Sequence, residues 1–262
     1  MSVLEAIILG LIQGLTEFLP VSSSGHIEIG KVVLGSKFSE DITFTIVVHG
    51  ATVLSTIVIF YRDILKLVAD SLKFQWNESV QYISKIVLSM IPVGIVGAFF
   101  KEEVETLFGG NIVFVGVMLL FTASLLTLAN FIRKGNRNIS FIDAFVIGIS
   151  QAIAVLPGIS RSGVTIAAGL LLGNKKETIA KFSFLMVLIP IIGANAMDLF
   201  ASGTNDGFNS NIGVIALSVG FITAFISGLF ACKWMIGIVR KGNLIYFAIY
   251  CIIMGTTAII FG

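Results

Sequence analysis

Two short segments of this sequence hold most of the side chains that could do chemistry. The first contains Gln13 and Glu17, followed by the run Ser22-Ser23-Ser24-Gly25-His26. Residues four apart lie on one face of a helix, so Gln13 and Glu17 are expected to point the same way. Glu17 would sit in the last turn of that helix, where a negative charge opposes the macrodipole. It is either a solvated glutamate at a helix end or a functional carboxylate, and its apolar surroundings favour function.

The serine run is expected to open a second helix. Ser22, Ser23 or Ser24 can cap that helix, and this structural role alone explains at least one of them. The free backbone N–H groups at a helix start, near Gly25, also form a ready anion site. His26 falls in the first turn and could carry a proton, although a lone histidine is more often a packed, hydrogen-bonded side chain.

The second segment, Ser160-Arg161-Ser162, opens a helix in the same way and has Thr165 one turn later. Arg161 is a cation at the helix end that disfavours positive charge, and it stands in a mostly apolar region. An anionic partner removes both objections, and two candidates stay open: Glu17 in a structural ion pair, or a bound phosphate. The planar guanidinium suits phosphate, and the nearby hydroxyls are additional candidate ligands.

Together these side chains predict one pocket. A carboxylate (Glu17), a hydroxyl (Ser23), an imidazole (His26), a guanidinium (Arg161) and two helix starts are the parts that phosphoryl transfer needs. The positive groups hold the oxygens, an oxygen nucleophile attacks, and the acid and base groups move protons. Residue types and spacing alone predict an anion or phosphate site. His49 has no polar neighbour in sequence and is predicted to be structural.

The elements that position these groups are predicted to lie in a membrane. Of the 262 residues, 56% are hydrophobic and 12% are charged, whereas a soluble domain carries about 25% charged residues. A soluble α/β protein is excluded because buried strands run about 4–8 residues, while the apolar runs here reach about 20, enough to cross a bilayer. The net charge of +2 gives no bulk field that would attract nucleic acid.

Six apolar stretches are long enough to span a bilayer: 42–61, 83–100, 112–132, 179–199, 211–232 and 243–261. Two further regions, 3–34 and 142–172, are each interrupted by a polar turn that contains Pro and Gly. Each would form two helices of about 12–16 residues, which rise about 18–24 Å, short of the ~30 Å hydrocarbon core. Both are predicted to be re-entrant helical hairpins, because irregular backbone at membrane depth must be buried in protein or line a wet cavity.

The two interrupted regions repeat one another. A shift of 138 residues without gaps aligns Gln13 with Gln151, Ser22 with Ser160, Ser24 with Ser162 and Gly25 with Gly163. Chance matching of apolar segments would preserve Leu and Ile rather than Gln, Ser and Gly in register. Each repeat, 1–138 and 139–262, holds a hairpin and three spans, and because three is odd the second copy is inverted. The predicted fold is therefore an all-α polytopic membrane protein with six transmembrane helices and two re-entrant hairpins in an inverted-topology repeat, with a site near the midplane.

The basic residues divide unequally between the two faces of this arrangement. One face holds 13 of the 17: Arg62, Lys66, Lys73, Lys85, Arg133, Lys134, Arg137, Lys175, Lys176, Lys181, Lys233, Arg240 and Lys241. The other face holds 3, namely Lys31, Lys37 and Lys101, and Arg161 lies inside the second hairpin. The basic face is predicted to be cytoplasmic, which places both termini outside.

Residues 13–26 and the run Pro157-Gly158-Ile159-Ser160-Arg161-Ser162-Gly163 resemble the two motifs of the undecaprenyl-diphosphate phosphatase family, the bacitracin-resistance proteins. Both motifs occur in order, and the similarity in length and span count covers the whole chain. The resemblance implies hydrolysis of a C55 isoprenoid diphosphate to its monophosphate in the bacterial plasma membrane, which recycles the lipid carrier for cell-wall synthesis. It also implies an active site that opens to the outer face and a divalent cation, Mg²⁺ or Ca²⁺.

By this resemblance, Arg161 binds the diphosphate oxygens, Ser23 is the candidate nucleophile, and His26 is a base or an acid. Glu17 is either a metal ligand or the group that orients His26. The first motif position, Glu or Gln in the family, is Gln13 here, which leaves Glu17 as the only carboxylate and weakens a two-carboxylate metal scheme. The candidate substrate-binding residues are Gln13, Ser22, Ser24, Gly25, Ser160, Ser162 and Thr165. Serine and metal-bound water both remain open as the attacking group.

Two other classes of protein share parts of this pattern. Ser24-Gly25-His26 resembles an element of the acid-phosphatase-like lipid phosphatases, but Arg161 lacks the following histidine of their downstream element, so convergence explains the shared tripeptide. A transporter that flips polyprenyl phosphate is the alternative function, because inverted repeats commonly support alternating access. Such a transporter needs no nucleophile such as Ser23. A homodimer stays open, because the sequence does not fix the oligomeric state.

Overall fold

The computed structural model describes residues 1–33, 42–107, 111–132, 135–205 and 212–262. The helices are α1 (Val3–Phe18), α2 (Ser23–Val33), α3 (Ile42–Ser71), α4 (Glu78–Phe99), α5 (Lys101–Thr106), α6 (Ile112–Phe131), α7 (Phe141–Ile153), α8 (Arg161–Leu171), α9 (Lys176–Met186), α10 (Leu188–Asn205), α11 (Val214–Lys241) and α12 (Ile245–Phe261). The only β-type pairing in these residues is an isolated bridge between Arg137 and Asn174. The predicted all-α class is confirmed.

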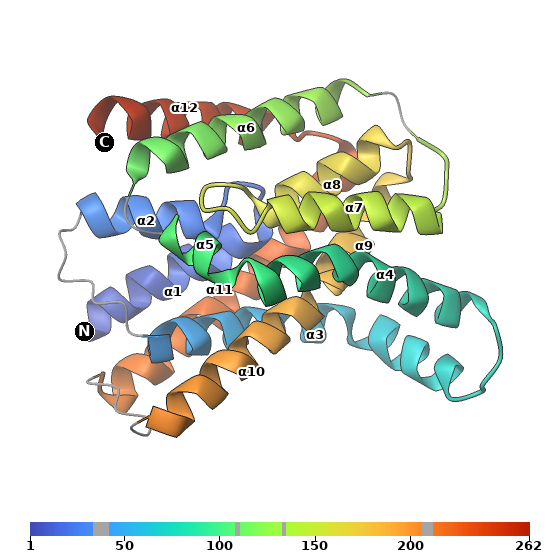
Figure 1. Cartoon of the computed structure of the whole chain (residues 1–262), viewed down its shortest axis with the longest axis horizontal. Coiled ribbons are helices and arrows are strands. Elements are labelled where there is room, and N and C mark those ends of the chain that lie inside the picture. Colours follow the sequence, from blue (N-terminus) through green and yellow to red (C-terminus); the bar gives the residue numbers. More distant parts are fainter. Residues whose placement is uncertain (34–41, 108–110, 133–134, 206–211) are drawn as a thin grey trace.

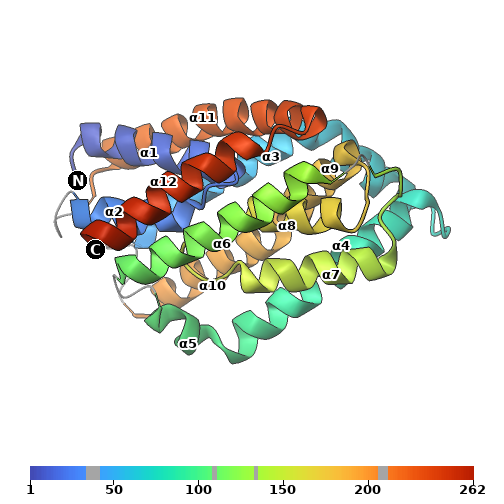
Figure 2. The ribbon, with the colours of Figure 1, turned by 90° about the horizontal axis from the view of Figure 1, so that it is seen from above.

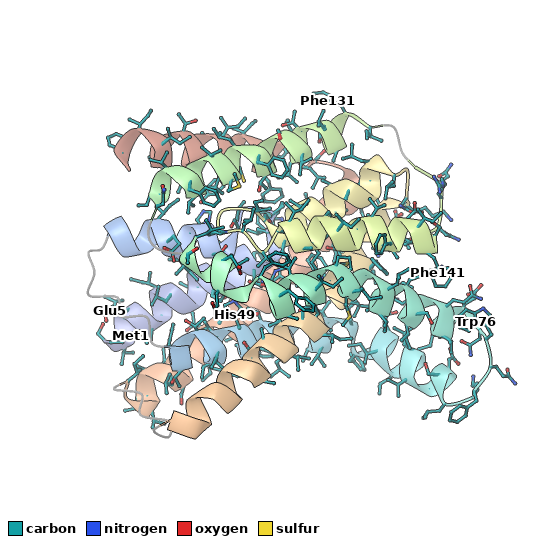
Figure 3. All side chains as sticks on the ribbon, in the orientation of Figure 1. Met1, Glu5, His49, Trp76, Phe131 and Phe141 are labelled. Carbon is teal, nitrogen blue, oxygen red and sulfur yellow. The ribbon has the colours of Figure 1, made fainter. Side chains whose placement is uncertain are left out.

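The helices run along the long axis of the molecule, and both termini lie at the same end (Figures 1 and 2). Met1 and Glu5 mark this end, whereas Trp76 and Phe141 mark the opposite one (Figure 3). Five positions used in the predictions lie outside the described residues: residue 34, where the first hairpin was expected to end, residue 211, where the fifth span was expected to begin, and the basic residues Lys37, Arg133 and Lys134.

Both interrupted regions form helical hairpins. The pair α1–α2 opens toward the end of the molecule that carries the termini, and α7–α8 opens toward the other end, so that the two tips approach each other near the middle (Figure 1). The first helix of each hairpin begins with a capping box. The hydroxyl of Ser2 accepts from the backbone N–H of Glu5, whose carboxylate accepts from the N–H of Ser2, and Ser140 with Asp143 repeats this capping box. The two boxes are 138 residues apart, which is the shift found in the sequence.

Small residues allow the leading helix of each hairpin to pack closely on a long helix from the other half of the chain. Helix α1 packs on α11, where a side chain at Gly14 would overlap the backbone of Ala224 and the hydroxyl of Ser227. Helix α7 packs on α4, where Gly148 faces the backbone of Ser89 in the same way. Close backbone approach at small residues is the usual means of helix association in a membrane. The hairpin tips are thus held by paired contacts.

Five segments among the described residues are long and apolar enough to cross a membrane: Thr43–Ser71, Glu78–Phe99, Ile112–Phe131, Lys176–Ala196 and Val214–Lys241. The sixth expected span is α12, a shorter apolar helix of 17 residues, so the count of six stays a prediction. The stretch 179–199 was expected as one helix but is divided into α9 and α10. Pro190 explains the division, because proline cannot donate the backbone hydrogen bond that would continue α9.

Candidate active site

Glu17 occupies the tip of the first hairpin. It lies in the last turn of α1, and its side chain is 7% exposed. Oε2 accepts hydrogen bonds from Gln13 Nε2 at 3.0 Å and from the hydroxyl of Ser23, the first residue of α2, at 2.9 Å. The i,i+4 spacing brings the glutamine to the carboxylate, as the sequence predicted. The interpretation of Glu17 as a solvated helix end is wrong, since the carboxylate is buried and faces the start of α2.

Arg161 reaches this carboxylate from the second hairpin. It is the first residue of α8, and its Nη2 lies 3.3 Å from Glu17 Oε1. The predicted meeting of the two tips is therefore observed, and of the two candidate anions it is Glu17 that faces Arg161 in the structure. The contact is longer than the 2.7–2.9 Å usual for N⁺–H···O⁻ bonds. The arginine side chain remains 31% exposed, so a guanidinium with five N–H donors keeps capacity for a second anion.

His49 is a member of this cluster that the sequence analysis assigned to a structural role. His49 is on α3, and its Nε2 lies 4.0 Å from Glu17 Oε2. Its Nδ1 lies 2.9 Å from the carbonyl oxygen of Thr45, one helical turn earlier. The expectation rested on the absence of polar neighbours in sequence. The structure brings a polar neighbour from another helix, and the structural role of His49 stays a prediction. Figure 3 places His49 between the two ends of the molecule.

His26, in contrast, does not face the Glu17–Arg161 pair in this structure. Its Nδ1 lies 2.8 Å from the carbonyl oxygen of Ser22, and its Nε2 lies 2.6 Å from the hydroxyl of Tyr250 on α12. The two rings are parallel, with centroids 5.5 Å apart. The expected contact of His26 with Glu17 and Arg161 is therefore not formed. Nothing in the local sequence links Tyr250 to the motif, since the two residues are 224 positions apart.

The remaining predicted hydroxyls mostly order the two tips. Ser22 Oγ accepts from the backbone N–H of Gly25 at 3.2 Å and lies 3.3 Å from Ser24 Oγ. In the second tip, Ser160 Oγ accepts from the N–H of Gly163 at 3.1 Å and lies 3.4 Å from Ser162 Oγ. These contacts are those of helix caps. Two hydroxyls do more: Ser162 donates to the carbonyl of Leu19 across the tips at 3.3 Å, and Thr165 contacts Ser183 on α9 at 2.5 Å.

A cavity adjoins the ion pair. Its lining includes polar side chains from five helices: Glu17, Thr52, Thr56, Gln151, Arg161, Ser162, Thr165 and Ser183. Apolar side chains line the rest: Phe18, Val53, Phe184, Val187, Leu188 and Ile191. A space lined by charged and hydroxyl groups together with hydrocarbon side chains suits a ligand that has a polar head and an apolar chain.

The motif resemblance implies a divalent cation, and the side chains around Glu17 include oxygen atoms that could bind one. Within the part of the chain that the structure describes, no three His, Cys, Asp or Glu side chains converge. Oxygen donors are nevertheless at hand, because the buried Oε1 of Gln13 has no hydrogen-bond partner there, and Ser23 and Glu17 add a hydroxyl and a carboxylate. Mg²⁺ is commonly held by one or two carboxylates together with substrate phosphates and water. The residues therefore fit a cation that binds together with a phosphate ligand.

Comparisons with known proteins agree with one another. The sequence profile described as bacitracin resistance protein BacA matches residues 6–257. A protein named undecaprenyl-diphosphatase from Bacteroides fragilis is 54% identical over 257 residues, which cover 98% of this chain and 97% of the relative. Proteins of the same name from Christiangramia forsetii and Oceanobacillus iheyensis are 53% and 38% identical, over 100% and 99% of this chain and 98% and 97% of the relatives.

Proposed function

This chain belongs to the bacitracin resistance protein family, and we propose that it hydrolyses undecaprenyl diphosphate to undecaprenyl phosphate and phosphate. The observation that carries the proposal is the meeting of Arg161 with Glu17 and Ser23 at the tips of two hairpins, beside a cavity lined by both polar and apolar side chains. The relatives described above are named for this activity, and this chain aligns with nearly their whole length. None of those relatives is named as a transporter, so the flippase alternative has no support among them.

Arg161 is the proposed ligand of the diphosphate. Its guanidinium can bind two phosphoryl oxygens side by side, and its start-of-helix position adds the backbone N–H groups of α8. In the structure the guanidinium lies 3.3 Å from the carboxylate of Glu17. A bound diphosphate would compete for the guanidinium, which frees Glu17 for proton transfer.

Ser23 is the proposed nucleophile and Glu17 its base. The serine hydroxyl donates to Glu17 Oε2 at 2.9 Å, the geometry that a proton transfer requires. In the first step the hydroxyl oxygen attacks the terminal phosphorus, the P–O bond to undecaprenyl phosphate breaks, and the proton passes to Glu17. Water then attacks the phosphoserine, releases phosphate and restores the hydroxyl.

His26 and His49 are placed for different parts of the reaction. His26 follows Ser23 by three residues and shares its face of α2, so we propose it as the acid for the leaving oxygen, a role that requires it to exchange the hydroxyl of Tyr250 for the substrate. His49 lies 4.0 Å from Glu17 and is proposed to stabilise its carboxylate form.

Glu17 and the Oε1 of Gln13 are the proposed ligands of a divalent cation bound with the substrate. Such a cation supplies neutralisation of phosphate charge and polarisation of the phosphoryl oxygen. The other candidate substrate-binding residues include the serines of the two helix caps and Thr165. Their proposed role is mainly to hold the two hairpin tips in place around the phosphate oxygens.

The membrane arrangement is part of the same proposal. We propose six spans and two re-entrant hairpins in two inverted repeats, with the basic end inside and both termini and the active site outside the plasma membrane. The common end of the two termini, the opposed opening of the hairpins and the matched capping boxes support it.

Phosphate release from purified protein in detergent tests the function. Wild type should release phosphate from undecaprenyl diphosphate and lose this activity with a chelator, and S23A should be inactive and fail to form an acid-stable phosphoserine. S124A, which removes an exposed hydroxyl on α6, is the matched control and should behave as wild type. If wild type releases no phosphate but moves polyprenyl phosphate across vesicles, the transporter alternative replaces the enzyme.

A further inference from the structure

Gln151 is a buried polar residue to which the mechanism above gives no role. It lies on α7 close to the tip of the second hairpin and is 1% exposed. Neither Nε2 nor Oε1 of its amide has a hydrogen-bond partner among the described residues. Removing an amide from water without replacing its hydrogen bonds opposes folding, so such a group needs an explanation of its own.

The repeat explains how the amide comes to lack a partner. Gln151 is the counterpart of Gln13, whose Nε2 donates to Glu17 Oε2 at 3.0 Å. Four residues after Gln151, at the position equivalent to Glu17, the chain has Val155. The second hairpin thus keeps the glutamine but not the carboxylate that would hold it, and the amide is left available for something else.

The surroundings of the amide indicate what that is. Gln151 lines the same cavity as Arg161, Ser162 and Thr165. An amide Nε2 provides two N–H donors, and the guanidinium of Arg161 provides further donors around the same space. Convergent donors in a buried cavity favour an anion with several oxygens.

We propose that Gln151 is a ligand of the diphosphate, donating from Nε2 to a phosphoryl oxygen that Arg161 also holds. The inference rests on the proposed function and adds a binding residue to it. The two repeat-related glutamines then have different tasks: Gln13 holds the carboxylate Glu17, and Gln151 holds the substrate. When the substrate binds, the unpaired amide forms a charge-assisted hydrogen bond. This hydrogen bond, which is absent from the folded protein alone, makes the free energy of binding more favourable.

The experiment compares Q151M, which keeps the size of the side chain, with Y82F. Tyr82 on α4 also has a buried hydroxyl without a partner in the described chain, but it does not line the cavity. We expect Q151M to raise KM for undecaprenyl diphosphate and to weaken inhibition by inorganic pyrophosphate, each about 10–100-fold, the effect of one hydrogen bond to a charged group. Y82F should change neither. Both variants should unfold at or above the wild-type temperature, because each removes an unpaired buried polar group.

A second variant and a second measurement separate the possible failures. Q151N keeps the amide but shortens its reach and should show part of the same loss if Q151M is poorly folded. Protection from thermal unfolding by pyrophosphate reports binding without hydrolysis. Equal KM and equal pyrophosphate protection in wild type and Q151M would overturn the role of Gln151. Absence of phosphate release from wild type would instead overturn the proposed function, while a loss of pyrophosphate protection in Q151M would still support the ligand role.

Discussion

The two hairpin tips share a scaffold but differ in chemistry. In both, a serine caps the second helix through the N–H three residues on, and a second serine lies beside the first. The aligned positions between and around these serines differ: Ser23 corresponds to Arg161, Glu17 to Val155 and His26 to Val164. The first tip therefore carries the proposed nucleophile and proton-transfer groups, and the second carries the proposed binding groups. A repeated scaffold thus supplies two helix starts that face each other, and substitutions on it make the pair asymmetric.

The backbones of the tips differ in a related way. The first tip turns within residues 19–22 and places Ser22 in the left-handed region, at φ 70°. The second turns over residues 154–160 and has Gly158, which adopts φ 92° without steric conflict. For a non-glycine residue such as Ser22, the left-handed conformation costs on the order of 1–3 kcal/mol of conformational energy. The contacts of Ser22 with Gly25 and His26 offset that strain, so the tighter turn occurs in the tip that presents the proposed nucleophile.

The largest expected effect is that of removing the carboxylate from the first tip. E17Q should lower kcat about 10²–10⁴-fold, the usual contribution of a positioned acid or base. It also leaves the charge of Arg161 without its partner. Phosphate release measures the loss, and E5Q, which changes a glutamate of the α1 capping box, should stay close to wild type in kcat. An E17Q protein with more than a tenth of wild-type kcat would contradict a catalytic division between the tips.

A change in the second tip should act on binding instead. R161K keeps the charge but loses the planar fork, so KM should rise about 10–100-fold, as for the loss of one charge-assisted hydrogen bond, with a smaller change in kcat. R137K is the matched control, because Arg137 pairs with Asp143 at the opposite end of the hairpin, 3.6 Å away. If R161K lowered kcat alone, the assignment of binding to the second tip would be wrong.

A smaller effect is expected at His49, which neither tip contains. H49Q removes a group whose Nε2 lies 4.0 Å from Glu17 Oε2, which is too far for a hydrogen bond. Activity should therefore fall only a few-fold at saturating substrate. A loss as large as that of E17Q would show that proton transfer depends on α3 as much as on the first tip. The catalytic groups would then not be confined to the first tip.

The parts of the site that the sequence predicted are those written within one segment or repeated at a fixed shift. The i,i+4 relation of Gln13 and Glu17 follows from helix geometry, and the meeting of Glu17 with Arg161 follows from two hairpins that enter from opposite ends. The contacts of His49 with Glu17 and of His26 with Tyr250 could not be predicted, because they depend on how α3 and α12 pack. The division of the stretch 179–199 was also missed, although Pro190 is a visible signal for it.

The smallest effects should come from the shared scaffold, and there the two tips should respond alike. S22A and S160A each remove a hydroxyl that accepts from a helix N–H, at 3.2 Å and 3.1 Å, and loss of such a cap costs about 0.5–2 kcal/mol. Thermal unfolding in detergent should show similar decreases for both variants, with S124A as the unaffected control. Since both serines cap and neither is a proposed catalytic group, kcat should change little in either. A much larger decrease for S22A would mean that its contacts hold the strained turn as well as the helix, in which case the scaffold itself is asymmetric and the chemistry of the first tip depends on a backbone that the second tip does not share.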